Sequence, residues 1–252
     1  MKKYLRLAPV LFAVSTIAFG LIEIITGNFH KGLLPVPLSL PGRTILVYSS
    51  GVIFVILGTG LFVNKWRNTA SFYLGIVYLI FFVFLHLVKL SADIYDPGEW
   101  TAAFEVLILC SGAFFIAGKL ITMSRYSLAL SFIVFAILHF KYADYISTLV
   151  PAWVPAKLFL AYFIGLAFLL TAISILLNIL TNLSTGLIGF MFLLWVMILH
   201  GPRTITAMNS EPEWTSLFVA LAAGGTSFML SYLSTGKTEK KTKRIANHPG
   251  FK

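Results

Sequence analysis

The chain has 252 residues, of which 58% are hydrophobic and only 11% are charged. A soluble globular domain carries about 25% charged residues, so this composition excludes an ordinary soluble protein and indicates a membrane protein. The net charge of +10 would suggest a nucleic-acid partner in a soluble protein. Here many basic residues lie in short loops and in a C-terminal tail, so we expect anionic lipid headgroups, and not nucleic acid, as their partner.

The single cysteine, Cys110, lies inside an apolar run. One cysteine excludes an intramolecular disulfide, a CxxC redox pair and a cysteine-ligated cluster. Nothing in the sequence resembles a phosphate-binding loop, a Ser-His-Asp arrangement or an HExxH metal motif. We therefore find no haem, flavin or metal signature.

Eight apolar runs predict helices that cross the bilayer. They are Leu7–Thr26, Thr44–Val63, Ser71–Leu90, Thr101–Ile121, Tyr126–Phe140, Leu158–Leu177, Leu183–His200 and Thr215–Leu233. The fifth run has only 15 residues, so we expect it to borrow the amphipathic segment Lys141–Ile146 or to thin the bilayer locally. The first run could pass for a secretory signal, but it continues past Gly20 to Ile25, which favours a retained helix.

An even number of spans places both termini on one side of the membrane. Counting Lys and Arg gives 13 on the side of the termini and 6 on the other. By the positive-inside rule, both termini are predicted to be cytoplasmic, in a bacterial inner membrane. The tail, residues 235–252, is predicted to be a basic segment that lies on anionic lipid.

An internal repeat organises the chain. At an offset of 114 residues, His86 aligns with His200, and Glu99-Trp100-Thr101 aligns with Glu213-Trp214-Thr215; 16 of 78 ungapped pairs are identical. Upstream of Arg43 the offset is 116, which places Glu23 opposite His139. Each unit holds four helices, and four is even, so both units enter the membrane the same way round. The predicted fold is an all-α polytopic membrane protein with two parallel four-helix bundles, residues 1–122 and 123–234.

Five ionisable groups lie within the predicted spans, namely Glu23, His86, Glu105, His139 and His200. The helical rise places them about 0 to 10 Å below the outer surface of the hydrocarbon. A charge at the centre of a spanning helix costs at least about 2.5 to 3.5 kcal/mol, so these groups should face protein and pair. We expect Glu23 to pair with His86, and His139 with His200, and we expect Tyr162 and water to complete the second pair.

This candidate site has two interpretations. Its polar contacts could simply lock helix packing, or its histidines could accept protons from a quinol or a transported substrate. Bis-histidine haem ligation by His86 and His200 is disfavoured, because Gly201 and Pro202 are expected to end the helix directly after His200.

Each unit has a proline-rich first outside loop. Such a loop could be an interfacial anchor or a lid over a pocket between helices. The fourth and eighth helices are expected to begin near Glu99 and Glu213, where an acid meets the positive end of the helix dipole. The loop residues of interest are Pro37, Pro41, Pro151, Trp153 and Pro155.

Three blocks of the second unit form a recognisable succession. They are Phe135-Ala-Ile-Leu-His139-Phe-Lys-Tyr-Ala-Asp-Tyr145, Leu149-Val-Pro-Ala-Trp-Val-Pro155 and Ala161-Tyr-Phe-Ile-Gly165. In these blocks the unit resembles the DoxX-like family of bacterial four-helix membrane proteins. The first unit resembles a degenerate copy, which keeps Phe19-Gly20, the prolines and Tyr48-Ser-Ser-Gly51 but carries Glu23 where the second unit has His139.

The resemblance implies a four-helix fold for each unit. The family takes its name from a subunit of a thiosulfate:quinone oxidoreductase, and other members are linked to oxidative-stress complexes at the membrane. It therefore implies an accessory or quinone-facing subunit of a membrane redox complex, in which His139, His200 and Tyr162 bind a quinone headgroup beside a partner subunit. The alternative is a non-catalytic membrane protein that binds or moves a small lipophilic molecule, or scaffolds a partner.

Overall fold

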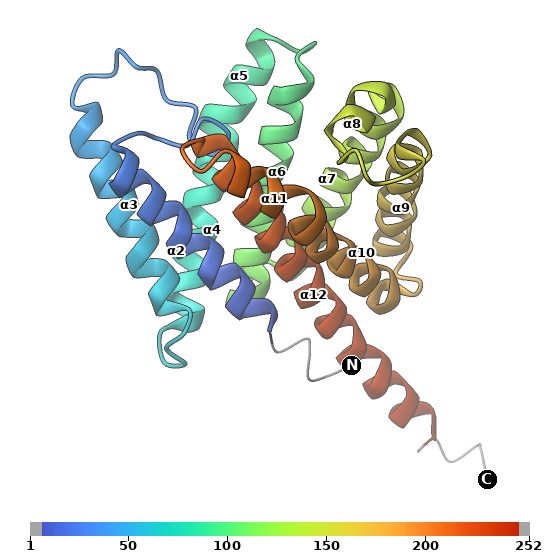
Figure 1. Ribbon diagram of the computed structural model, residues 1–252. Helices are drawn as coiled ribbons and strands as arrows, with labels where there is room; N and C mark the ends of the chain where they lie inside the picture. The colour runs from blue at the N-terminus through green and yellow to red at the C-terminus, as the bar shows by residue number, and fades with distance from the viewer. Residues whose placement is uncertain (1–6, 247–252) are drawn as a thin grey trace.

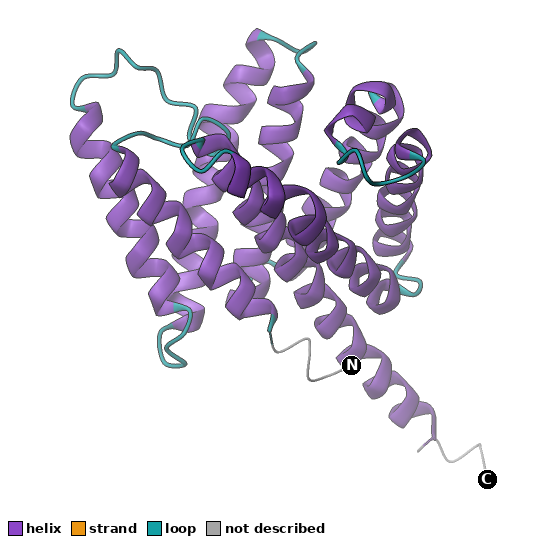
Figure 2. Cartoon of the chain, viewed as in Figure 1, coloured by secondary structure: helices purple, strands orange, loops and turns teal. Residues whose placement is uncertain are grey.

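The computed structural model describes residues 7–246, which form helices joined by loops, with no strand in that range (Figure 2). Eight segments are long and apolar enough to cross a membrane, so the predicted all-α polytopic fold is confirmed. The outer surfaces of these spans expose large apolar side chains such as Phe84, Leu187 and Phe190, as expected for helices that contact lipid. Residues 1–6 and the last six residues of the predicted basic tail lie outside the described residues.

The spans follow the predicted order, and the third and seventh each consist of three pieces. The bounds are α2 (Ala8–Thr26), α3 (Arg43–Gly60), α4 (Arg67–Phe81) with η1 (Phe82–His86) and α5 (Leu87–Ala92), α6 (Pro97–Ala117), α7 (Ile121–Lys141), α9 (Lys157–Leu177), α10 (Thr181–Trp195) with η2 (Val196–His200) and α11 (Gly201–Thr206), and α12 (Glu211–Ala246); a short helix, α8 (Ala143–Leu149), follows α7. The predicted tail therefore begins as a continuation of α12.

The fifth span differs from both predicted alternatives. Gly118 has a left-handed backbone (φ 67°) and ends α6 at Ala117, earlier than predicted. The residues that follow are thereby free to begin α7 at Ile121, which gives that helix 21 residues. The helix gains its length at its N-terminal end, so it does not need the segment 141–146, most of which forms α8 instead.

The expected end of the seventh span at His200 is also wrong. The chain continues as a helix to Thr206, with Pro202 in the first turn of α11. A proline is tolerated in a first turn because its missing N–H has no helical partner there. The π turn η2 directly before α11 interrupts the regular α-helical hydrogen bonds, so Pro202 stands at a new helix start.

The last helix of each unit lies at the centre of the molecule (Figure 1). We refer to α2–α6 as the first unit and to α7–α12 as the second. Helices α6 and α12 pack against each other, α7 packs against α6, and α2 packs against α12. The first helix of each unit thus contacts the last helix of the other unit. A twofold axis along the bundle produces such reciprocal contacts. The two units therefore share one core.

The secondary structure repeats with the sequence. The pairs α4 and α10, η1 and η2, and α5 and α11 have the same lengths and lie 114 residues apart. Each π turn ends at a histidine, His86 or His200. Because a π turn is rare, its presence in both units at one offset is strong evidence that the units are structurally equivalent.

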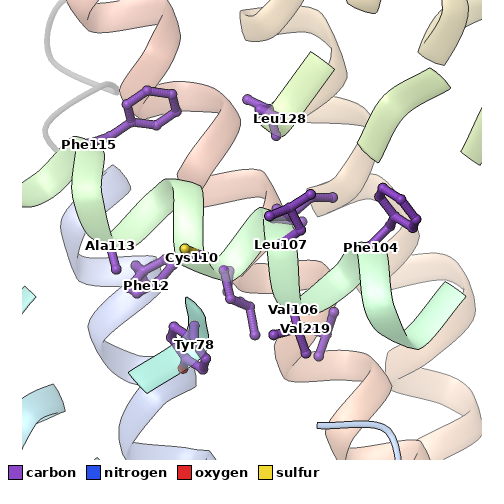
Figure 3. Packing of buried hydrophobic residues seen from close by; sticks show 14 of the residues in the cluster. Phe12, Tyr78, Phe104, Val106, Leu107, Cys110, Ala113, Phe115, Leu128 and Val219 are labelled. Atoms are coloured by element: carbon purple, nitrogen blue, oxygen red, sulfur yellow. The ribbon is translucent and has the colours of Figure 1, made fainter. Parts of the chain in front are cut away.

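Aromatic side chains fill matching positions in the two halves of the core. Phe54 packs against Phe19 and Tyr78 in the first unit. Their counterparts Phe168, Phe135 and Phe192 are joined in the same way in the second. Figure 3 shows Tyr78 meeting Phe12 of α2 near Cys110 of α6. These side chains bring the first three helices of each unit together directly beneath the candidate site.

Candidate functional site

The candidate site lies at one end of the bundle, which we call the first-loop face. This end carries the first loop (residues 27–42), α8 and the turns 93–96 and 207–210. Each predicted site residue belongs to the half of its helix that is nearer to this face. The sequence predicts that the first-loop face is the outer one.

His30 is the main residue of this face that the sequence analysis did not single out. Its side chain is fully buried beneath the first loop. Its Nε2 lies 2.8 Å from the carbonyl oxygen of Phe19, and its Nδ1 lies 2.7 Å from Thr215 Oγ1 and 3.0 Å from Glu211 Oε1. His30 therefore joins the first loop both to α2 and to α12 of the second unit.

The hydrogen-bond geometry indicates that His30 and Glu211 are linked through a hydrogen. The Phe19 carbonyl can only accept, so Nε2 carries a hydrogen. The single hydrogen of the Thr215 hydroxyl is donated to Glu211 Oε1 at 2.5 Å. A second hydrogen must then lie between Nδ1 and these two oxygens. It joins the buried ring of His30 to the partly buried carboxyl group of Glu211, at 3.0 Å.

Glu23 lies behind this pair and is also fully buried. Its Oε2 accepts a hydrogen bond of 2.6 Å from Ser50 Oγ, whereas its Oε1 has no partner among the described residues. His30 and Glu211 are its charged neighbours. Gly51 brings α3 close to this point, because a Cβ there would lie 2.9 Å from the Gly20 carbonyl oxygen. The close approach places Ser50 within reach of the carboxylate.

His86 has a different partner from the one predicted. Its Nε2 lies 3.1 Å from the carbonyl oxygen of Leu33 in the first loop, and its Nδ1 is buried without a partner among the described residues. Glu23 binds Ser50, so the structure does not bring Glu23 and His86 together as a hydrogen-bonded pair. His86, on η1, therefore binds the first loop from one side. His30, which is part of the loop, binds it to α12.

In the second unit, His139 is only half-buried. Its Nδ1 lies 2.8 Å from the Phe135 carbonyl oxygen and must donate to it, which leaves Nε2 as a free acceptor. The imidazole meets the Phe168 ring edge to face at 5.3 Å. Tyr162 stacks on Phe140 and is 45% exposed. Within the described residues, no hydrogen bond joins His139 to Tyr162 or to His200, so the predicted second pair is not formed either.

His200 and Glu105 complete the predicted set. His200 is half-buried, its Nδ1 has no partner among the described residues, and Arg203 and Glu213 are its charged neighbours. Glu105 is half-buried, eight residues after the start of α6 and so deeper than predicted. Its carboxylate has no hydrogen bond or ion pair in the described part of the chain. The second unit carries Val219 at the matching position, so this carboxylate is peculiar to the first.

The two proline-rich loops are arranged differently. Phe29, His30, Leu33 and Leu34 are buried in the first half of the first loop, whereas Pro37 and Pro41 in its second half are exposed. In the second loop only Val150 is buried, Pro151 is partly exposed, and Trp153 and Pro155 are exposed. The first loop therefore enters the space between the helices and covers Glu23, while the second loop lies on the surface.

The repeated Glu-Trp-Thr motifs form matching structural contacts at the first-loop face. Glu99 accepts a hydrogen bond from Lys89, and Glu213 accepts one from Arg203 at 2.6 Å. In both units the Trp Nε1 donates to a backbone carbonyl six residues upstream, at 2.8 Å. The motif thus fixes the turn between two helices. The sequence carried a signal for the ion pair, because Lys89 and Arg203 are also 114 residues apart.

An apolar groove lies away from these groups, between α9 and α10 near the opposite face, and Leu170, Leu177 and Leu187 are among its lining residues. None of the predicted site residues lines it. Comparisons of the chain with protein-family models, with curated proteins and with solved structures found no match. The geometry of the site and the resemblance of the second unit are therefore the basis for the functional proposal.

Proposed function

We propose that the protein binds the headgroup of a quinone-class molecule in the second unit, as an accessory subunit of a redox complex in the bacterial inner membrane, with both termini cytoplasmic. His139 carries this proposal. It offers a free acceptor nitrogen, Nε2, beside the ring of Phe168, in a half-buried position on a membrane-spanning helix. The resemblance of the blocks around His139, Trp153 and Gly165 to the DoxX-like family supports it.

A quinol headgroup needs both a flat apolar wall and a hydrogen-bond acceptor. The partly exposed ring of Phe192 supplies the aromatic wall, and the buried rings of Phe135 and Phe168 support it from the core. The Nε2 of His139 would accept from a quinol hydroxyl, and the exposed Tyr162, on α9, is the candidate donor to a quinone carbonyl. Because the hydrogen bond to Phe135 fixes the ring tautomer, the acceptor is in place before the ligand arrives.

Quinol oxidation releases two protons and two electrons. In this proposal His139 takes up one of the protons at Nε2, and the electrons pass to an oxidant held by a partner subunit. The role of this chain is then to position the headgroup and to receive a proton at the first-loop face. His200 lies on η2, eight residues after Phe192, and the additional residue of the π turn brings it close to the same face of the helix as Phe192. It is the candidate for the second proton.

A second candidate function is binding or movement of a lipophilic molecule without electron transfer. The apolar groove between α9 and α10 favours it, because leucines such as Leu170, Leu177 and Leu187 could hold a hydrocarbon chain. This function needs no acceptor at position 139. The two candidates therefore differ in what a substitution of His139 does.

The test uses full-length protein purified from its native membrane in mild detergent, followed by solvent extraction and mass spectrometry for quinones. His139→Phe keeps a ring against Phe168 and removes the acceptor. We expect it to lower quinone retention about tenfold, which corresponds to the loss of one good hydrogen bond. The control is Phe163→Leu on the exposed side of α9, which should retain quinone like the wild type.

Two outcomes would overturn the quinone proposal. The first is a wild-type preparation without quinone that also fails to bind added short-chain quinol. The second is His139→Phe protein that retains as much quinone as the control variant. Retention of lipid or another apolar molecule, unchanged by His139→Phe, would support the second candidate instead.

A further inference from the structure

The structure assigns a proton-binding site to the junction between the two units. We propose that a proton held between His30 and Glu211 ties the first loop to α12, and that its release lets the loop lift from the first unit. This site does not depend on the proposed quinone site, because it lies in another part of the first-loop face and shares no residue with it.

The position of His30 makes it a link between units. It belongs to a loop of the first unit, and two of its three hydrogen-bond partners, Glu211 and Thr215, belong to the opening turns of α12 in the second. The third partner is the Phe19 carbonyl on α2. A single side chain thus bridges α2, the first loop and α12, and it is fully buried at that point.

Removal of the Nδ1 proton would leave this arrangement without enough hydrogens. The Nδ1 lone pair would then face Glu211 Oε1 at 3.0 Å. The one hydrogen of Thr215 could serve only one of these two atoms, and the other would be a buried acceptor without a donor. Such an acceptor costs about 1 to 3 kcal/mol. The contact between the loop and α12 therefore weakens when the proton leaves.

The charged side chains that face His30 from the helices are carboxylates. Glu23 faces His30 from α2, and Glu211 faces it from α12. The nearby cations are at the surface: Lys31 is exposed, and the Arg43 guanidinium, at the start of α3, lies 5.3 Å from the centre of the Phe29 ring and binds Asn28. Two carboxylates thus face one buried imidazole ring, and the nearby cations do not bind it.

Lifting the loop would have a defined consequence inside the first unit. The loop carries the Leu33 carbonyl that binds His86 Nε2, and it covers Glu23. Displacement of the loop would break the bond to His86 and admit water to Glu23 Oε1 and His86 Nδ1, which both lack a partner among the described residues. Release of the proton would therefore open the first unit toward the first-loop face.

The experiment measures how accessible the buried half of the loop is as the pH changes. Cys110 is the only cysteine of the chain and is buried, so Cys110→Ala gives a background for a single new thiol. Leu34→Cys reports on the buried half of the loop, where Leu34 is 5% exposed. Leu38→Cys, where Leu38 is 82% exposed, corrects for the intrinsic dependence of thiol reactivity on pH. The measured quantity is the ratio of the two maleimide labelling rates in full-length protein in vesicles.

We expect this ratio to rise about tenfold when the pH is raised from about 5 to about 9, because the proposed contact needs the shared proton. His30→Gln keeps a neutral hydrogen-bonding group but cannot share this proton, so the rise in that variant should be clearly smaller, whatever the level of the ratio. A flat ratio in the His30 protein, or an unchanged rise in the His30→Gln protein, would overturn the proposal. Quinone retention should be the same in both proteins, which keeps this test separate from that of the proposed function.

Discussion

The two units place different groups at the same position of their first helix. In the first unit, Glu23 is fully buried, binds Ser50 and lies under the first loop. In the second, His139 is half-buried, donates only to its own backbone at Phe135, and has Ile164 where the first unit has Ser50. The helix positions are equivalent, so the difference comes from the side chains and the loop above them. One scaffold thus gives a closed polar cluster in one half and an accessible acceptor in the other.

Substitution of His30 should give the largest difference between the units. His30→Ala removes a fully buried side chain and leaves the Phe19 carbonyl and Glu211 without their partner, so it should destabilise the protein by about 2 to 4 kcal/mol. Ile146, which aligns with His30 at the offset of 116, is only partly buried, so Ile146→Ala should cost less than about 2 kcal/mol. Unfolding in mixed micelles, followed by circular dichroism, measures both. Equal losses would show that the contacts of His30 contribute no more than ordinary packing.

Close helix packing should give the next largest difference. A Cβ at Gly20 would lie 2.4 Å from the Gly51 carbonyl oxygen, so Gly20→Ala should cost about 1 to 3 kcal/mol. The matching residue in the second unit is Ala136, which already has a Cβ. Gly32→Ala is the control, because nothing lies within 4 Å of its Cβ position. The same unfolding assay applies, and a harmless Gly20→Ala change would contradict the packing described here.

The tryptophan contacts should behave alike in the two units. Trp100→Phe and Trp214→Phe each remove an indole hydrogen bond of 2.8 Å and keep most of the ring. We expect a loss of about 1 kcal/mol for each. Their stacking partners, Phe104 and Phe218, are also equivalent. Clearly unequal losses would mean that the two turns do not have the same structural role.

The ion pairs at the first-loop face should give the smallest effect. Lys89 and Arg203 are both partly exposed, with 43% and 38% of their side-chain surface accessible, so each pair should contribute less than about 1 kcal/mol. Double-mutant cycles that combine Glu99→Gln with a substitution of Lys89, and Glu213→Gln with a substitution of Arg203, give the pairwise energies. We expect similar values in both units, and a coupling above about 2 kcal/mol in either would contradict the exposed geometry.

The spans could be predicted because an apolar run of about 20 residues is rare outside membrane-spanning helices. The repeat could be predicted because rare residues such as Trp100 and Trp214 align. His30 could not be found in this way. It lies in a loop, where no periodicity indicates which side chains point inward and where a titratable side chain carries no membrane-insertion cost that would single it out. The pairing of Glu23 with His86 failed for the same reason, since each binds a group that the first loop or α3 supplies.

The π turns were also invisible in the sequence, because both copies carry the extra residue and the units align there without a gap. The presence of the π turn in both units bears on how the duplicated chain arose. A π turn ending in histidine that occurs in both copies is most simply inherited from a single ancestral unit, before duplication. The bridge from His30 to Glu211 has no counterpart in the other half, where Ile146 and Pro97 occupy the matching positions, so the two halves have come to differ in how their first loops are held.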